Sequence, residues 1–292
     1  PRCYGRTTLQ AGESAFVALG WGGAVPTGLD EALGHLHRTE AFWREWISMA
    51  TIPDHRFRPY IERSALALKG LSYAPTGAIM AAATTSLPET PGGERNWDYR
   101  FTWIRDTGFM LRALHGLDLN WEAYEYFAFI LDALGGAGTD QPWDLQIMYG
   151  IRGETDLTEH ILDHLTGYRG SRPVRIGNGA FDQRQHDVWG MLFDSVEEHL
   201  RHGGQIAPTV WEQMAGLVDT AIQRSADPDQ GIWEMRGEPK DFVASKVLCW
   251  VAADRGASLA ERRGDDARAQ RWRAASVEIA QEICERGVDD RG

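Results

Sequence analysis

From residue 30 onward, apolar residues recur every three or four positions along most of this 292-residue chain. This spacing is typical of amphipathic helices that bury one face. The first predicted helix starts near residue 30, is irregular near Arg38, and ends at Pro53, because proline cannot continue a helix. Seven further helices are predicted, with apolar faces at 60–68, 109–114, 121–134, 188–200, 211–222, 242–251 and 272–283.

Several of these helices are followed by glycine, which is typical of helix ends. These glycines are Gly116, the Gly135-Gly136 and Gly203-Gly204 pairs, and Gly287. Thr209 and Glu212 have the spacing of a capping box at the start of the helix at 211–222.

Short turns and long segments alternate between the helices, and the longest segment runs from residue 135 to about residue 182. The long segments are rich in glycine, aspartate, arginine and tryptophan. Loops of this length are usually functional. We therefore expect antiparallel helical hairpins in a ring or bundle, with the long loops gathered at one end to form a site.

Residues 1–25 have a different pattern. Their apolar and polar positions alternate weakly, with breaks at Gly12 and Gly20. Weak alternation bounded by glycine predicts strands joined by a turn.

Composition excludes several classes of partner. The hydrophobic fraction is 43%, the net charge is −12 and the isoelectric point is about 5.2. An acidic globular chain should bind neither nucleic acid nor an anionic membrane surface. No apolar run approaches the roughly 20 residues that span a bilayer. Cys3, Cys249 and Cys284 form no metal or disulfide pattern, so we expect a reducing, cytoplasmic location.

Twelve tryptophans are a high number for this length. They can serve as large core side chains, or as rings that stack on the C–H face of a sugar.

Three long segments carry the candidate chemistry. The first, 95–106, reads RNWDYRFTWIRD and combines aromatic rings with fixed charges. The second, 167–187, contains amide and charged side chains suited to binding hydroxyl groups, namely Arg175, Asn178, Gln183, Gln185 and Asp187. In the third, 227–237, Glu234 follows Trp233, whose ring could desolvate the carboxyl and favour a general acid.

Each segment also has a purely structural interpretation. Arg105 and Asp106 could form an ion pair at a helix start, where an acidic residue is favoured. Glu234 could be a solvated carboxylate, and the segment 167–187 could be surface decoration.

A metal site is the main competing prediction. His160 and His164 have the i, i+4 spacing of two ligands on one helix face. The zinc-protease motif needs Glu after the first His, where this chain has Ile161. We therefore expect no metal, and a helix in which Glu159 and Asp163 partner the histidines. Phosphate-loop and serine-hydrolase motifs are missing from the sequence.

Read together, these segments resemble glycoside hydrolase family 15, which contains glucoamylases, glucodextranases and a bacterial branch of α,α-trehalases. The resemblance starts near residue 58 and includes GAIMAAATTSLPE at 77–89, RNWDYRFTWIRD, LTEHILDHLTGYRGSRPVRIGNGA, QHDVWG and GIWEMRGEPKDFVASKVLCWVAADRG. It implies a mainly α fold, a partial (α/α)6 barrel of the six-hairpin glycosidase type. By this resemblance, residues 1–25 are the last strands of an N-terminal β-sandwich, 26–57 are linker helices, and 58–292 begin the catalytic barrel.

The resemblance also implies inverting hydrolysis of an α-glucosidic bond, with Glu234 as the general acid. Trp103, Arg105 and Asp106, with Tyr99 nearby, would bind the glucose at the cleaved end. The second segment would add contacts from Arg175, Asn178, Gln185 and Asp187, and Trp233 would stack on the sugar. Inversion also needs a carboxylate base. The base motif of the family lies further downstream and no Glu here matches it, so we expect a fragment cut at both ends and inactive alone.

Within the family, the sequences LTEHILDHLTGYRGSRPVRIGNGA and QHDVWG are most similar to those of the actinobacterial trehalases. A glucoamylase-like α-glucosidase acting on malto- or isomalto-oligosaccharides, and a sugar-binding relative without hydrolysis, remain alternatives. The trehalase branch also implies phosphate and Mg²⁺, although no motif here marks a site for either. The sequence is compatible with a monomer or an oligomer.

Overall fold

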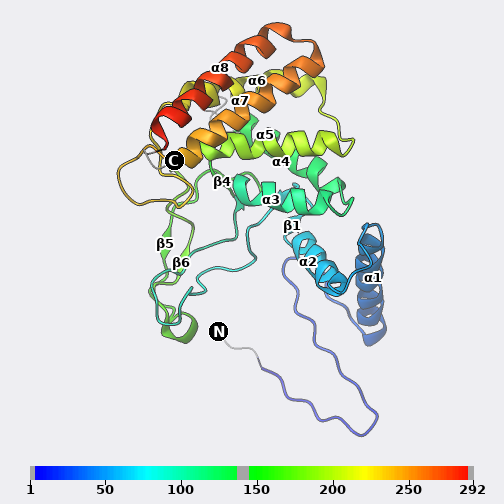
Figure 1. Cartoon of the computed structure of the whole chain (residues 1–292). Helices are drawn as coiled ribbons and strands as arrows, with labels where there is room; N and C mark the ends of the chain where they lie inside the picture. The colour runs from blue at the N-terminus through cyan, green and yellow to red at the C-terminus, as the bar shows by residue number, and fades with distance from the viewer. Residues whose placement is uncertain (1–3, 137–144, 289–292) are drawn as a thin grey trace. The chain divides into compact units, whose positions relative to one another are not determined.

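The computed structural model describes residues 4–136 and 145–288 (Figure 1). Clustering of its contacts divides the chain into two units, Pro1–Ala50 and Thr51–Gly292, which are described separately.

In the first unit, the helix predicted from residue 30 is α1, Leu29–Ser48. It runs through Arg38 without interruption and ends before Pro53, so the predicted irregularity is wrong. Among residues 4–28 the structure has a turn at 11–12 and no strand, so the predicted strands are not formed. Val17, Leu19 and Trp21 are almost fully exposed, and a strand that pairs with nothing and buries nothing is unstable. The assignment of residues 1–25 to a β-sandwich stays a prediction.

In the second unit, all seven helices predicted from the apolar pattern are confirmed. They are α2 Arg58–Gly70, α3 Ile104–His115, α4 Trp121–Gly136, α5 Asp187–Arg201, α6 Trp211–Arg224, α7 Val243–Arg263 and α8 Asp266–Arg286. Gly116 and Gly287 stand at the C-caps of α3 and α8, as predicted.

The predicted capping box of α6 is wrong. Val210 occupies the N-cap and no side chain caps this helix. Thr209 lies in a short 3₁₀ turn, Pro208–Val210, and the Glu212 carboxylate instead pairs with the Arg268 guanidinium of α8 at 2.7 Å. The Glu212 side chain, which the local pattern assigned to the cap, therefore forms an ion pair with another helix.

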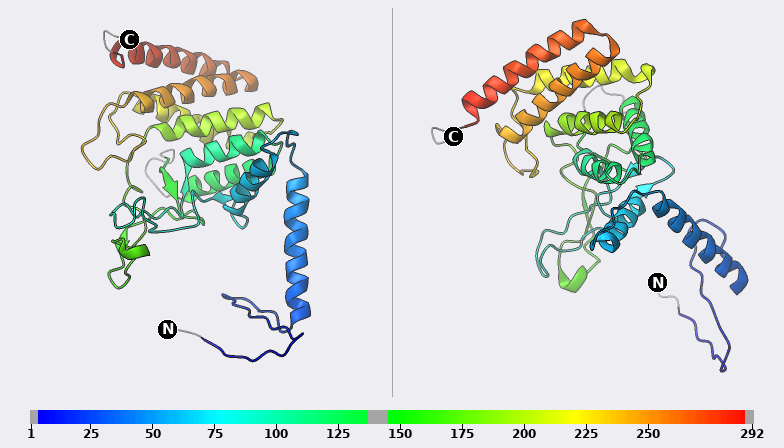
Figure 2. Two further views of the ribbon diagram at one scale, coloured as in Figure 1. Left: turned by 60° about the horizontal axis from the view of Figure 1, so that its bottom comes forward. Right: turned by 45° about the vertical axis from the view of Figure 1, so that its right-hand side comes forward.

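The helices of this unit form antiparallel hairpins. α3 packs on α5, and α5 packs on α7. Each of these helices is followed in the chain by a helix that runs back in the opposite direction, namely α4, α6 and α8. The short turns at 116–120, 202–210 and 264–265 lie at the right in Figure 1, and the long connections lie at the left (Figures 1 and 2). The predicted array, with its long loops at one end, is confirmed.

Small residues allow α5 and α7 to approach closely. A Cβ added at Gly190 of α5 would lie 2.2 Å from the Leu248 carbonyl oxygen of α7. Gly256 of α7 also packs closely, against Val218 of α6, where an added Cβ would lie 2.7 Å from a methyl carbon. This close packing fixes the start of α5, which carries Asp187, against the start of α7.

The described parts of the long connections contain three two-stranded antiparallel sheets. β1 Ser72–Tyr73 pairs with β2 Ala78–Ile79, β3 Thr102–Trp103 with β4 Met148–Tyr149, and β5 His160–Ile161 with β6 Arg175–Ile176. The helix expected around His160 and His164 is therefore wrong, because His160 pairs with Ile176 across a ladder.

The described residues contain neither a cluster of metal ligands nor a membrane-spanning helix. Among them, no group of three or more His, Cys, Asp or Glu residues is placed to hold a metal ion. No helix in this part of the chain has both the length and the apolar character needed to cross a membrane. Cys249 is buried and Cys284 exposed, both as free thiols, whereas Cys3 lies outside the described residues.

Three histidines gather at the short-turn end of the helices. His115 ends α3, and its ring stacks on that of His202 at 5.0 Å and lies 5.6 Å from that of His199. His199 is 1% exposed, and within residues 4–136 and 145–288 neither of its ring nitrogens has a hydrogen-bond partner. Burial, followed by the charges of His115 and His202, lowers the pKa of His199 to about 4.

This burial predicts a loss of stability in acid. Between pH 6.5 and 4 the unfolded chain binds a proton at His199 that the folded chain does not. The free energy of unfolding therefore decreases as the pH is lowered through this range. We expect a loss of at most about 3 kcal/mol from this group. His199→Phe should remove this part of the pH dependence, measured by urea unfolding at pH 7 and pH 4.5. The exposed His164→Phe is the control and should keep the wild-type dependence. Equal pH dependence in wild type and His199→Phe would contradict the prediction.

Candidate active site

Three segments meet where the long connections join the helices. Arg105 lies in the first turn of α3 and Asp187 is the first residue of α5. Glu234 lies in the connection between α6 and α7. Because α3 and α5 are neighbours that start at the same end, their first residues lie side by side. The structure thus brings together residues from all three segments singled out in the sequence.

The Arg105 guanidinium is the centre of this group. Its Nη1 donates to Gln185 Oε1 at 3.1 Å and lies 3.4 Å from Asp187 Oδ2. Its Nη2 lies 3.7 Å from Glu234 Oε1, and its Nε lies 3.8 Å from Asp106 Oδ2. One cation therefore offsets three carboxylates that would otherwise repel one another.

The Glu234 carboxyl is held from the first segment. Trp103 Nε1 donates a hydrogen bond to Glu234 Oε1 at 2.9 Å. Trp103 is buried, whereas Trp233 is 81% exposed. The ring that contacts the Glu234 carboxyl in this structure is therefore that of Trp103. Desolvation of Glu234 by Trp233 stays a prediction. The exposed Trp233 ring is available for stacking.

Glu234 also has an unusual backbone. Its φ of 53° lies in the left-handed region, which residues other than glycine seldom adopt. Gln183 Nε2 donates to the carbonyl oxygens of Glu234 and Met235 at 3.4 Å, and Gln183 Oε1 accepts from Gln185 Nε2 at 3.2 Å. The sequence suggested Gln183 only as a hydroxyl-binding group. The structure shows it joining the second segment to the third.

Burial shifts the pKa values of two carboxyls and a phenol in the group. It raises the pKa of Asp187 and of Asp106 above their ordinary values, against the opposing charge of Arg105. Asp187 Oδ1 is buried with no hydrogen-bond partner in the described part of the chain. Tyr99, whose ring lies 6.1 Å from that of Trp103, has a pKa raised first by burial and then by nearby carboxylates. The group is thus less hydrated than an ordinary surface cluster.

Arg175 has structural partners. Its guanidinium pairs with Glu159 at 3.1 Å, donates to the Glu94 carbonyl oxygen at 2.8 Å, and lies over the Trp97 ring at 4.7 Å. These contacts brace the second segment against the first. A role for Arg175 in substrate binding stays a prediction.

Asn178 is likewise held by the backbone. It is buried, its Oδ1 accepts from the Ala180 N–H at 3.0 Å, and its Nδ2 donates to the Asp98 carbonyl oxygen at 3.4 Å. The sequence analysis missed Asp98, whose buried carboxylate binds Arg100 and accepts from the Gly177 N–H at 3.1 Å. Nothing in the sequence around Asp98 indicated its contact with Gly177, which is 79 positions away.

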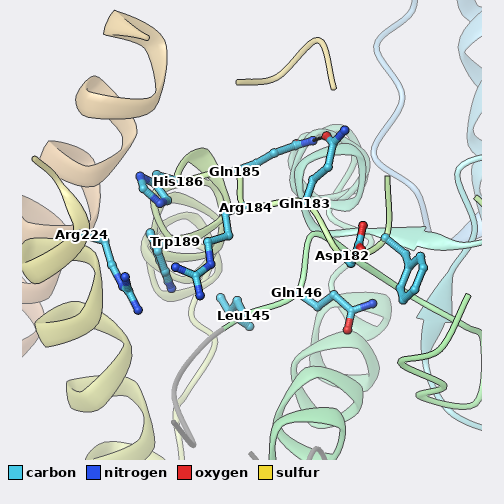
Figure 3. A pocket seen from close by; sticks show the side chains of 10 residues that line it. Leu145, Gln146, Asp182, Gln183, Arg184, Gln185, His186, Trp189 and Arg224 are labelled. Atoms are coloured by element: carbon cyan, nitrogen blue, oxygen red, sulfur yellow. Dashed lines mark hydrogen bonds between the residues drawn. The ribbon is translucent and has the colours of Figure 1, made fainter. Parts of the chain in front are cut away.

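A cavity of about 290 Å³ adjoins this group and is shown in Figure 3. Gln183 and Gln185 line one part of it. Arg184 and Arg224 lie on either side of Trp189 (Figure 3). This cavity could not be identified from the sequence, because its lining comes from the α4–α5 connection and from two helices, α5 and α6.

The contacts of Arg105 lead us to expect that its substitution lowers the free energy of unfolding. Arg105→Met would leave Asp187, only 2% exposed in its side chain, without its cation. Removing one partner of a buried ion pair is strongly destabilising, and we expect a loss of about 2–4 kcal/mol in urea unfolding. Adding Asp187→Asn should restore at least about 1 kcal/mol, because the unpaired charge is gone. Arg286→Met, in an exposed pair with Glu282, is the control and should cost less than about 0.5 kcal/mol. Equal losses in the Arg105 and Arg286 variants would contradict the prediction.

The chain is similar in sequence to several proteins named trehalase. The chain is 52% identical to a trehalase of Mycobacterium tuberculosis and 51% identical to one of Mycolicibacterium smegmatis, over 98% of this chain in both cases. A trehalase of Thermoplasma volcanium is 40% identical over 87% of the chain. The chain spans only about two-fifths of the length of these curated relatives, 42%, 43% and 40% respectively.

A solved glycosidase structure has the same fold, with a TM-score of 0.52 and 17% identity over 82% of this chain and 60% of that one. This likeness and the helical array confirm the predicted glycosidase fold of the (α/α)6-barrel type. The family model described as glycosyl hydrolases family 15 matches residues 55–292. The chain therefore belongs to glycosyl hydrolase family 15.

Proposed function

We propose that this chain provides the glucose pocket and the general acid of an α,α-trehalase, which hydrolyses trehalose to two glucose molecules with inversion. The observation that carries the proposal is the Glu234 carboxyl, held by the Trp103 N–H and beside Arg105 where three segments meet. The similarity to proteins named trehalase supports the choice of substrate. A cytoplasmic location stays a prediction.

In the proposed reaction, Glu234 protonates the oxygen between the two glucose rings as the bond from that oxygen to C1 breaks. Its Oε1 is occupied by Trp103 and Arg105. We therefore assign the transferred proton to Oε2. A carboxylic acid at this position lowers the barrier by supplying the proton that the leaving glucose needs.

The glucose that is attacked would lie between the first and third segments. Arg105 and Asp106 would hold its hydroxyls while the ring flattens and gains positive charge. Tyr99, whose ring lies 6.1 Å from that of the buried Trp103, would give an aromatic contact, and the exposed Trp233 ring would cover the sugar from the third segment. Asp187 would act mainly by fixing the Arg105 guanidinium.

An inverting enzyme also needs a carboxylate base roughly 6.5–9.5 Å from the acid, with space for water between them. The carboxylates described beside Glu234, those of Asp106 and Asp187, face the same Arg105 guanidinium that Glu234 does. We therefore propose that the base comes from a part of the longer protein that these 292 residues do not contain. On this proposal, the chain alone hydrolyses no trehalose.

The function is tested with the full-length protein. We expect faster glucose release from trehalose than from maltose or isomaltose. Proton NMR of the first products should show α- and β-glucose in equal amounts, because the attacked ring inverts while the leaving glucose keeps its α configuration. Only α-glucose would contradict inversion, and a preference for maltose would instead indicate a glucoamylase-like enzyme. Trehalose binding without glucose release would indicate a binding protein.

Glu234→Gln in the same assay tests the general acid. The amide cannot donate the proton, so we expect kcat to fall about 10²- to 10⁴-fold. Glu238→Gln, an exposed residue of the same connection, is the matched control and should keep wild-type activity. Full activity in Glu234→Gln would show that the assignment is wrong.

We also propose that phosphate binds in the cavity of Figure 3. The lining residues fit an anion: Arg184 and Arg224 contribute two guanidinium groups, and Asp182 contributes one carboxylate. Arg224 also pairs with the Asp227 carboxylate at 3.2 Å. The buried Trp189 Nε1 has no hydrogen-bond partner among the described residues and can donate to a phosphate oxygen. The described residues do not fit Mg²⁺, because none of their acidic or histidine groups forms a suitable cluster.

The phosphate site predicts a measurable effect. In the full-length protein, Arg224→Gln with Arg184→Gln should weaken phosphate binding at least tenfold in calorimetry, because both charge-assisted contacts are lost. Arg263→Gln, an exposed arginine on α7, is the control and should leave the affinity unchanged. Unchanged affinity in the double variant would place phosphate elsewhere.

A further inference from the structure

A second cavity lies between α4, α5 and α6. Its volume is about 180 Å³, and apolar side chains form most of its wall, among them Phe127, Leu131, Val196, Met214 and Leu217. On each helix these residues stand three or four positions apart, so one face of each helix is turned to the cavity. Nothing in the proposed reaction uses this space.

The cavity is of a size that holds a small molecule. An engineered apolar cavity of about 150 Å³ in another protein stays dry and binds benzene. An empty space of this kind deprives its wall of dispersion contacts, and a molecule of matching shape restores them. A cavity of about 180 Å³ therefore favours a compact apolar guest of roughly the same size.

Two polar side chains line this apolar space, the exposed Gln205 and the buried His199. His199 is 1% exposed, and neither of its ring nitrogens has a hydrogen-bond partner among the described residues. The edge of the Tyr124 ring at 4.4 Å and the Phe127 ring at 5.2 Å hold the imidazole in place. Gly204 packs against it, since an added Cβ there would lie 2.2 Å from Nε2. The imidazole is fixed and buried, with its hydrogen-bonding capacity unused.

The wall also restricts the chemistry of the guest. Its lining contains no Asp, Glu, Lys or Arg among the described residues, so it offers nothing to balance an ionic charge. Burial keeps the imidazole neutral near pH 7, because the pKa of His199 is lowered to about 4. A neutral imidazole provides one donor and one acceptor. A sugar is excluded, because most of its hydroxyls would find no partner in an apolar wall.

We propose that this cavity binds a small uncharged phenol or alcohol, with its apolar body between α4 and α6 and its hydroxyl on the His199 imidazole. The site is separate from the proposed glucose pocket. His199 and Asp187 lie twelve residues apart on α5, which corresponds to roughly 18 Å along the helix.

The test compares two probes of similar shape, phenol and toluene, with the full-length protein in the absence of trehalose. We expect saturable phenol binding by calorimetry, and at least tenfold weaker toluene binding, because toluene has no hydroxyl for His199. His199→Phe should reduce phenol affinity at least tenfold while toluene affinity changes less. Equal affinities for the two probes, or no saturable phenol binding, would overturn the proposal.

A cavity-filling variant tests the location and guards against misfolding of the His199 variant. Ala128 lines the cavity from α4, so Ala128→Leu should fill part of it and weaken phenol binding at least tenfold. Ala267→Leu, at an exposed position of α8, is the matched control and should bind phenol as wild type does. Unchanged phenol affinity in Ala128→Leu would also overturn the proposal. Glu234→Gln should bind phenol normally, so failure of the proposed reaction and failure of this site can be told apart.

Discussion

The structure of the candidate site depends on the Arg105 guanidinium. Glu234, Asp187 and Asp106 come from different segments of the chain, and each has an oxygen within 4 Å of this group. Carboxylates gathered this closely in a partly buried place would repel one another without a cation among them. Arginine suits the position better than lysine, because its planar fork contacts several oxygens in fixed directions.

The helical packing makes this arrangement possible. α3, α5 and α7 start at one end, so residues at the starts of these helices meet there although they are far apart in sequence. The close approach of α5 to α7 at Gly190 fixes Asp187 against the connection that carries Glu234. At the opposite end the turns are short. The buried polar groups there include the histidines around His199 and two carboxylates with cationic partners, Glu122 with Lys69 and Glu197 with Arg262.

Features set by local sequence could be predicted well. The apolar period located all seven helices of the second unit, because a helix buries a face defined by residues three or four apart. The errors at His160 and at the capping box of Thr209 and Glu212 have one cause, a contact with a residue far away in the sequence. His160 pairs with Ile176 in a two-stranded sheet, and the Glu212 carboxylate pairs with Arg268. The resemblance pointed to Glu234, but not to its contact with Trp103, which is 131 positions away. Adjacency in sequence suggested Trp233 instead, because neither the alternation of a strand nor the composition of a loop identifies a partner so far away in the chain.

The backbone of Glu234 shows why these long-range contacts matter for the chemistry. A left-handed conformation at a residue other than glycine costs about 1–3 kcal/mol and persists only where the surroundings impose it. Here the surroundings are the Trp103 N–H and the Arg105 guanidinium on the side chain, with Gln183 on the carbonyl oxygen. The connection at 227–237 would not keep this conformation by itself. The orientation of the proposed acid is therefore a property of the assembled loops, and the first and second segments contribute to it as directly as the third.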